Sequence, residues 1–390
     1  IEYATFFGSI KIFKYLFAQK CSLSSDLILF AIHGRNPEII HILEENNIEQ
    51  KDMLYEKCLS YAIKCHHNEL VDYIINNYIK SEDISTKIFS KSLKNFNFQL
   101  IRPEMVNSDS FNEICIQNHY NLAKILLEKD KSIDINSRIK KNISNNLTEY
   151  TILFISIQLG NIDIVKLLLE NKDIDVNKKS IDEGDGNHNE ITPLFIAVLY
   201  QENEIVSLLL DHKDIDVNMK SKHGKEEEAP INAAISNDDD EIVQMLLNHK
   251  NIDVNIRSLK YDEDFDECTS EFYREVTPLY QASGFCKNPK IVQLLINHKN
   301  VDLNAIINTR EEQYYTSTGK RFEPSYIEET AFYAAVDKGK TENVRILLNK
   351  ENIDINFKSK IYRNNKLDKL FSVLERAVYR RNLDVLRLLL

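Results

Sequence analysis

Apolar residues recur along this chain in blocks that combine two helical stripes with a short extended stretch. Residues 192–218 show the pattern most clearly. Thr192 and Pro193 suit the start of a helix, because a Thr side chain caps free N–H groups and Pro lacks the donor that the first turn leaves unpaired. The apolar positions then have the 3.6-residue period of two successive amphipathic helices separated by a polar turn. The block therefore predicts a helix pair followed by an extended excursion.

The block repeats, and each copy closes on the string D-[IVL]-N. The six strings begin at Asp134, Asp175, Asp216, Asp253, Asp302 and Asp354. A unit of this size cannot bury its own apolar face and must stack on its neighbours, which predicts a solenoid. We count about eleven units, with residues 82–106 holding one that cannot be aligned. Small residues recur at one position of the first helix, and we expect adjacent helices to approach most closely there: Ala197, Ala234, Ala282 and Ala335.

Three features of the block resemble the ankyrin repeat. They are T-P-L at Thr192 and Thr277, G-N-I-D-I-V-K-L-L-L from Gly160 to Leu169, and D-V-N from Asp216. The resemblance implies an all-α ankyrin-repeat solenoid of helix-turn-helix units with long β-hairpin fingers, over residues 111–390. Residues 1–110 are weaker in pattern and resemble the divergent N-terminal module of large ankyrin families of some protists.

The chain departs from the family pattern in two ways. The His of the family's T-P-L-H is absent, and we expect aromatic packing to replace its hydrogen bonds. The residues at that position are Phe154, Phe195, Asn232, Tyr280 and Tyr333. The chain also begins and ends inside a repeat without a polar cap, so we expect it to be a fragment of a longer protein.

Composition narrows the class of partner. The net charge is -11, which argues against general nucleic-acid binding and against docking on anionic membranes. No apolar run approaches the roughly 18 residues that a membrane helix needs. The six Cys are irregularly spaced, as in reduced thiols of a cytoplasmic, intracellular protein rather than a disulfide framework.

No arrangement of residues indicates catalysis or metal binding. Nucleotide-binding, hydrolase and zinc motifs are absent. The acidic segment Asp182–Glu190 lacks the ligand order of a calcium loop, and Cys65, His66 and His67 point in different directions if they are helical. We therefore predict a protein that is not an enzyme and has no catalytic, metal or cofactor-binding residues.

The two longest excursions lie between Asn255 and Thr277 and between Asn304 and Thr330. They are rich in aromatic residues and Arg, the residue types that dominate binding hot spots. The candidate partner-binding residues are Tyr261, Phe265, Phe272, Tyr273, Arg274, Tyr314, Tyr315, Arg321, Phe322 and Tyr326. In the alternative interpretation, the two fingers pair with each other and contribute nothing to binding.

The favoured function is a non-catalytic scaffold that binds a protein partner through its concave face and finger loops. The acidic balance favours a partner with a neutral or basic surface. Two alternatives belong to other classes: an accessory substrate-recognition module of a larger enzyme, which the full reading frame would reveal, and a structural or cytoskeleton-associated component, which co-sedimentation would test.

Overall fold

The computed structural model describes residues 1–24, 26–46, 52–78, 84–106, 108–143, 146–183, 188–264, 268–315, 324–363 and 366–390. Contacts divide the chain into two compact units, residues 1–133 and 134–390, and each unit is described by itself. The predicted division into 1–110 and 111–390 follows the quality of the repeats rather than compactness, and it stays a prediction.

The N-terminal unit consists of short helices that pack in sequential pairs. They are α1 (Glu2–Phe6), α2 (Ile10–Ala18), α3 (Leu27–Gly34), α4 (Pro37–Glu45), α5 (Asp52–Lys64), α6 (Asn68–Tyr78), α7 (Ile84–Lys94), α8 (Ser108–Ile116) and α9 (Tyr120–Lys129). Within the described residues, α7 is followed by two 3-10 turns, η1 (Phe98–Leu100) and η2 (Pro103–Met105), rather than by a second helix of its own pair. Pro103 lacks the N–H that a helix interior requires. This missing helix is the reason why residues 82–106 could not be aligned with the other repeats.

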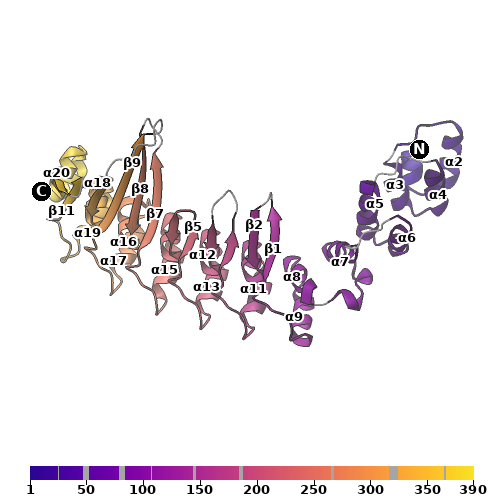
Figure 1. Ribbon diagram of the computed structural model, residues 1–390, viewed down its shortest axis with the longest axis horizontal. Helices are drawn as coiled ribbons and strands as arrows, with labels where there is room; N and C mark the ends of the chain where they lie inside the picture. The colour runs from indigo at the N-terminus through magenta and orange to yellow at the C-terminus, as the bar shows by residue number, and fades with distance from the viewer. Residues whose placement is uncertain are drawn as a thin grey trace. The chain divides into compact units, whose positions relative to one another are not determined.

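The C-terminal unit alternates helix pairs with β-hairpins (Figure 1). Its helices are α10 (Ile152–Gln158), α11 (Ile162–Leu169), α12 (Pro193–Leu199), α13 (Asn203–Leu210), α14 (Pro230–Ser236), α15 (Asp240–Asn248), α16 (Pro278–Phe285), α17 (Pro289–Ile296), α18 (Ala331–Asp337), α19 (Thr341–Leu348), α20 (Val373–Tyr379) and α21 (Leu383–Leu389). Its strands are β1 (Arg138–Ile143), β2 (Asn146–Thr151), β3 (Ser180–Asp182), β4 (Asn189–Ile191), β5 (Ser221–His223), β6 (Glu226–Glu228), β7 (Ser258–Asp264), β8 (Cys268–Val276), β9 (Ile307–Tyr315), β10 (Ser325–Glu329), β11 (Lys358–Arg363) and β12 (Lys366–Ser372). The predicted solenoid of helix pairs with β-hairpin fingers is confirmed.

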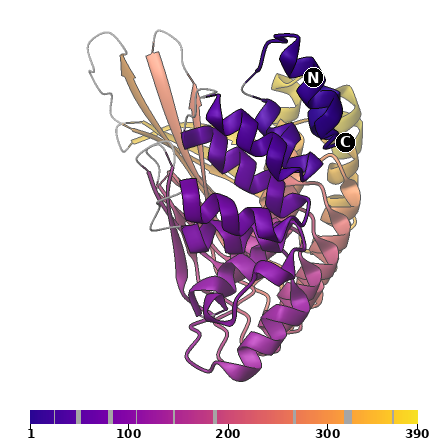
Figure 2. The same ribbon diagram turned by 90° about the vertical axis from the view of Figure 1, so that its right-hand side faces the viewer.

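The hairpins join one another in a way that the sequence did not predict. All the described strands belong to one antiparallel sheet with the order β1 to β12. Between neighbouring hairpins the pairing varies from a single residue pair, Glu190↔Lys222 or Glu227↔Leu259, to the long run from Cys268↔Tyr315 to Arg274↔Thr309. The sheet extends to one side of the helices (Figure 2) and does not form a central core.

The first helices begin as the Thr-Pro pattern predicts. The hydroxyl oxygens of Thr151, Thr192, Thr277 and Thr330 accept hydrogen bonds from the N–H of the residue three positions on, at 3.1–3.3 Å. At that position four of the five residues are aromatic and buried: Phe154, Phe195, Tyr280 and Tyr333. The Phe154 ring stacks on Tyr150 at a centroid distance of 5.0 Å, so aromatic packing does occupy the place of the family's His. The small residues Ala197, Ala234, Ala282 and Ala335 have 0% of their surface exposed, which agrees with close helix contacts.

The six D-x-N strings are equivalent in the structure. In each string the Asp Oδ1 accepts from the N–H of the Asn two residues later, at 2.9–3.1 Å. The Asn side chain reaches the next repeat. Asn218, for example, donates through Nδ2 to the Asn251 carbonyl at 2.8 Å and accepts through Oδ1 from the Asp253 N–H at 2.9 Å. The same two bonds start from Asn136, Asn177, Asn255 and Asn304. The strings therefore fix the spacing of consecutive repeats as well as their own turns.

We expect Asn218→Ala to lower the free energy of unfolding by about 1–2 kcal/mol, because two hydrogen bonds between repeats are lost. Chemical denaturation of the full chain measures the change. Lys213→Ala is the matched control, since this exposed side chain lies in the same turn and makes no bond to the next repeat that the structure shows. Equal stability of the two variants would contradict the proposed role of the Asn.

Candidate functional site

The two predicted fingers are the hairpins of β7 with β8 and of β9 with β10, and β8 and β9, with 9 residues each, are the longest of the described strands. Strand β8 pairs with β9 as well as with β7, so the two fingers form one continuous surface. The alternative interpretation, in which the fingers pair with each other, is therefore correct for their backbones. Backbone pairing leaves the side chains on the two faces of the sheet, because successive residues of a strand project to opposite faces.

A row of four tyrosines and one arginine crosses five strands, β7 to β11, on one face of this surface. The residues directly opposite each other are Tyr261 with Tyr273, Tyr273 with Arg310, Arg310 with Tyr326, and Tyr326 with Tyr362. Directly opposed residues in antiparallel strands project from the same face, so these side chains share one side of the sheet. We call these five residues the tyrosine row. Its side chains are partly exposed, and the rings of Tyr261 and Tyr273 lie 5.3 Å apart.

Charged groups pair with one another along the row. Lys225 donates to the Tyr261 hydroxyl at 2.8 Å and lies 4.1 Å from the centre of its ring. The same ammonium contacts Glu271 at 3.1 Å, and Tyr273 donates to Glu271 at 2.9 Å. The hydrogen bond to Tyr261 raises the pKa of Lys225. Burial raises the pKa of Glu271, but Lys225 and Tyr273 more than offset this and the net shift is downward.

Further along the row, Arg310 pairs with Glu312 at 2.7 Å and Lys360 pairs with Glu328 at 2.9 Å. Because acidic and basic groups are interspersed, the aromatic rings are the common element of this face. Half-exposed Tyr side chains supply contact area at a low cost in conformational entropy.

Two of the candidate residues lie on the opposite face, which meets the first helices. Phe272 and Arg274 flank Tyr273 in the strand and therefore project the other way. Arg274 donates to Thr309 Oγ1 at 3.1 Å, and its guanidinium lies 5.5 Å from the centre of the Phe285 ring at the end of α16. Lys338 approaches the same ring at 5.4 Å, and 43% of Phe285 is exposed. This face therefore carries a smaller aromatic and basic cluster.

The ten candidate residues thus separate into groups. Tyr261, Tyr273 and Tyr326 belong to the tyrosine row, whereas Phe272 and Arg274 lie on the helix-side face. The backbones of Tyr314 and Tyr315 pair with Thr269 and Cys268. Phe265, Arg321 and Phe322 lie outside the described residues.

Sequence reasoning missed three contributors to this face. Arg310 was not among the ten candidates although it lies in the second finger, and Lys225 and Tyr362 come from neighbouring hairpins. The two-residue period of a strand could have separated Tyr273 from Phe272. Only the pairing between hairpins reveals that Arg310 and Tyr362 continue the row.

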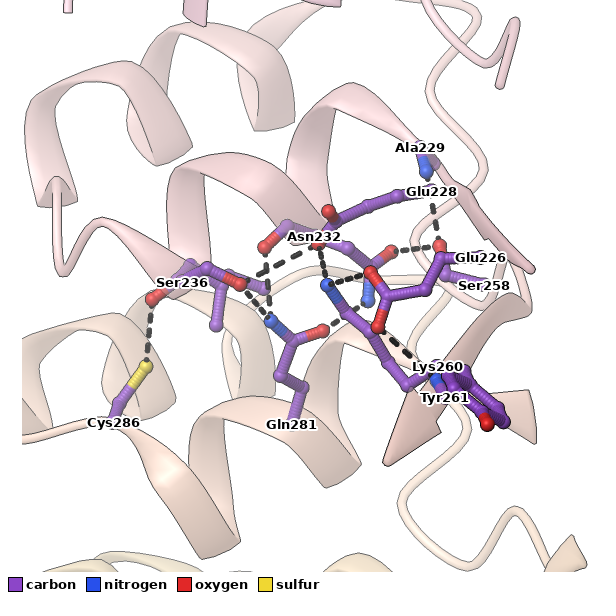
Figure 3. Close-up of polar contacts among 11 residues, drawn as sticks. Glu226, Glu228, Ala229, Asn232, Ser236, Ser258, Lys260, Tyr261, Gln281 and Cys286 are labelled. Carbon is purple, nitrogen blue, oxygen red and sulfur yellow. Dashed lines mark hydrogen bonds and ion pairs between the residues drawn. The ribbon is translucent and has the colours of Figure 1, made fainter. Parts of the chain in front are cut away.

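A buried polar network anchors the first finger to the helices (Figure 3). The Ser258 hydroxyl accepts from the Ala229 N–H at 3.0 Å and donates to Asn232 Oδ1 at 2.9 Å. Asn232 donates in turn to Gln281 on the next first helix at 2.8 Å. Asn232 stands where the family has His, so a buried amide network replaces aromatic packing in this one repeat and joins α14, α16 and β7.

An ion pair completes the anchor. Lys260 contacts Glu228 at 2.5 Å and Glu226 at 3.7 Å, and Glu226 accepts from the Tyr261 N–H at 3.1 Å. Burial raises the pKa of Glu228, although Lys260 opposes the shift. The start of β7, and with it the position of Tyr261, is therefore fixed by contacts to the preceding hairpin and helix.

The described part of the chain shows no cluster of His, Cys, Asp or Glu that could hold a metal ion. Among these same residues, no helix has the length and apolar character required to cross a bilayer. Cys58, Cys115 and Cys286 are buried, and burial raises the pKa of each thiol to about 12. Cys21 is exposed and Cys65 is half-buried.

Helix pairs, hairpin fingers and D-x-N turns together define a repeat solenoid, and comparisons with known families agree. A model of three ankyrin repeats matches residues 106–180 and 178–258, and a single ankyrin repeat model matches residues 275–308. Residues 17–102 match a domain of unknown function, DUF3447. The chain is an ankyrin repeat protein with a DUF3447 domain at its N-terminal side.

Comparison with solved structures finds ankyrin repeat proteins of low sequence identity. The ankyrin repeat domain of Bcl-3, described as a unique member of the IkappaB protein family, is 19% identical with a TM-score of 0.46, and the match covers 71% of this chain and 97% of that one. The ankyrin repeat protein EF0377 is 20% identical with a TM-score of 0.42, covering 63% of this chain and 98% of that one. No curated protein matches the chain. Ankyrin repeats are generally protein–protein interaction modules and typically non-catalytic.

Proposed function

We propose that this protein is a non-catalytic scaffold that captures a protein partner on the finger sheet, with the tyrosine row at the centre of the contact. The observation that carries the proposal is the alignment of Tyr261, Tyr273, Arg310, Tyr326 and Tyr362 across strands from three successive repeats. Aromatic residues and Arg are enriched at the energetic centres of protein interfaces.

The chemistry of the surface indicates the kind of partner. The acidic and basic side chains beside the row already neutralise one another, while the whole chain has a net charge of -11. A partner with a neutral or basic surface therefore avoids long-range repulsion. We do not propose nucleic acid or anionic membranes as partners, because both are negatively charged, as this chain is.

The helix-side face is the second candidate, and one observation favours it. Arg274 and Lys338 both lie against the half-exposed Phe285, on the side expected to form the concave face. Because Tyr273 and Arg274 are neighbours in β8 but face opposite ways, variants of each can separate the two surfaces without moving the strand.

The test uses the full chain as bait in a lysate of its native cell, with captured proteins quantified by mass spectrometry. We expect Ala at Tyr261, Tyr273 and Tyr326 together to reduce capture of the partner at least tenfold, about 1.4 kcal/mol. The melting temperature should change little, since all three side chains are partly exposed.

The matched control combines Arg274→Ala with Lys338→Ala on the helix-side face. Loss of capture by this variant alone would assign the partner to the second candidate surface. Unchanged capture by both variants would remove the finger sheet from the proposed function.

A further inference from the structure

The N-terminal unit has a feature that the finger sheet does not explain: the turns that join each first helix to the next element lack acidic residues. These five turns are residues 5–9, 31–36, 62–67, 92–98 and 115–119. Arg35, Lys64 and Lys94 supply positive charge. Four His and four Phe accompany them: His33, His66, His67, His119, Phe6, Phe7, Phe96 and Phe98. We call these turns the turn strip.

Some turns of the C-terminal unit share this absence of Asp and Glu, among them residues 286–288 and 380–382, whereas others carry acidic residues. The chain has 60 acidic residues against 49 Lys and Arg. In the C-terminal unit, the corresponding turn between α14 and α15 holds Asp238 and Asp239, and Asp240 begins α15. The turn geometry therefore accepts carboxylates, and their exclusion from the strip is not a requirement of the fold. The carboxylates closest in sequence are Glu38 and Glu69, on the following helices, and Glu113, on α8. Glu38 is paired with Lys14, and Glu113 accepts a hydrogen bond from Gln117 Nε2 at 3.1 Å.

Contacts join the five turns into one continuous edge. The rings of Phe6 and His33 stack at 3.9 Å, and Arg35 Nε donates to His67 Nδ1 at 2.7 Å. Asn97 Nδ2 donates to the Ile63 carbonyl at 3.0 Å, and His119 Nε2 lies 2.9 Å from the Leu93 carbonyl oxygen. Each turn thus touches the next.

Arg35, Lys64 and Lys94 give this edge its positive charge. Burial and the neighbouring Arg35 guanidinium lower the pKa of His67, whose Nδ1 accepts from Arg35 Nε. Lys64 and Lys94 are exposed at the C-terminal ends of α5 and α7. The positive groups recur in successive repeats, so an elongated ligand could meet several of them.

Phe96 is the most informative residue of the strip. It adopts a left-handed backbone conformation with φ of 54°, and 68% of its surface is exposed. Other turns of this unit place Gly8, Arg35, His66 and Asn118 in that conformation. A bulky residue there is strained although most of its surface stays exposed, and such strain is concentrated at functional sites. Phe98, which is 50% exposed, and His119 pack edge-on against the same ring.

We propose that the turn strip is a second binding surface, independent of the finger sheet, and that it takes an extended acidic peptide segment of a partner protein. Arg and Lys would pair with its carboxylates, and Phe96 with Phe98 would receive an apolar side chain. A peptide fits better than nucleic acid, because tight binding to a polyanion uses roughly 6–10 phosphate contacts and the strip offers three Lys and Arg side chains.

The experiment measures fluorescence anisotropy of a labelled Glu-rich peptide containing two Phe residues, titrated with the full chain. We expect saturable binding that weakens as salt is added, and no binding of the same peptide with Lys in place of Glu. Lys64→Glu with Lys94→Glu should weaken binding at least tenfold. The control, Lys124→Glu with Lys129→Glu, makes the same charge change on α9, outside the five turns, and should bind like the wild type.

Phe96→Gly separates binding from folding. Glycine adopts a left-handed conformation without strain, so this variant should melt no lower than the wild type while binding the peptide at least fivefold more weakly. Three results would each overturn the proposal. The control pair could weaken binding as much as the Lys64 and Lys94 variant does, Phe96→Gly could bind normally, or a single-stranded RNA could bind more tightly than the acidic peptide. Ala substitutions in the tyrosine row should leave peptide binding unchanged, so failure here and failure of the finger site are distinguishable.

Discussion

Replacing Gly34 by Ala should destabilise the N-terminal unit by about 3 kcal/mol or more, at or above the usual range for overpacking. A methyl group on Gly34 would meet the Thr5 carbonyl oxygen at 2.2 Å and the Gly8 backbone nitrogen at 2.7 Å. Both obstacles are backbone atoms, so no rotamer change relieves the clash. The first repeat must move away from the second, and the shared core around Phe13, Leu27 and Ile39 would open.

Urea denaturation followed by circular dichroism measures this effect. Gly160→Ala is the control, because Gly160 has a positive φ of 66° but its methyl group would meet only the Glu202 carboxylate at 3.6 Å. That variant should lose only the cost of a left-handed Ala, about 1–2 kcal/mol. If Gly34→Ala costs no more than Gly160→Ala, the close approach of the first two repeats is not as described.

Ala234→Leu should reduce the free energy of unfolding by about 1–3 kcal/mol. Ala234 has no exposed surface and lies on α14, which packs between α12 and α16. Three additional heavy atoms have no space there, so the neighbouring repeats must separate or adopt strained rotamers. Thermal melts of the full chain measure the change.

Gln244→Leu provides the comparison, since it adds a similar apolar side chain at an exposed position of the same repeat. We expect it to leave the melting temperature nearly unchanged. A normal melt for Ala234→Leu would contradict the alignment of repeats that placed this Ala at the helix contact.

Much of the fold could be predicted because its determinants are local. The D-x-N strings mark equivalent turns, and Thr192 and Thr277 cap helices as expected. The Asp of each string bonds within its own turn, which is also local. The Asn of the same string bonds to the following repeat, and that role depends on the stacking distance, which a single repeat does not specify.

The candidate site was less predictable, because its arrangement depends on contacts between repeats rather than on local determinants. Tyr261 and Tyr273 belong to one hairpin, and their proximity follows from its length. Arg310 joins them only because β8 and β9 pair over a long stretch, which depends on how two separate repeats stack. Composition identified the fingers as candidates, but it could not choose a face for Phe272 or Arg274.

The number of residue pairs that join neighbouring hairpins varies along the sheet, and this variation has a mechanical consequence. Hairpins are joined by one residue pair at β4 with β5 and at β6 with β7, but by seven consecutive pairs at β8 with β9. A bending load on the C-terminal unit would concentrate at the two single-pair joints, where least hydrogen bonding resists it. Strands β7 to β12 would move together as a rigid body. The residues of the tyrosine row would therefore keep their distances from one another while the preceding repeats bend.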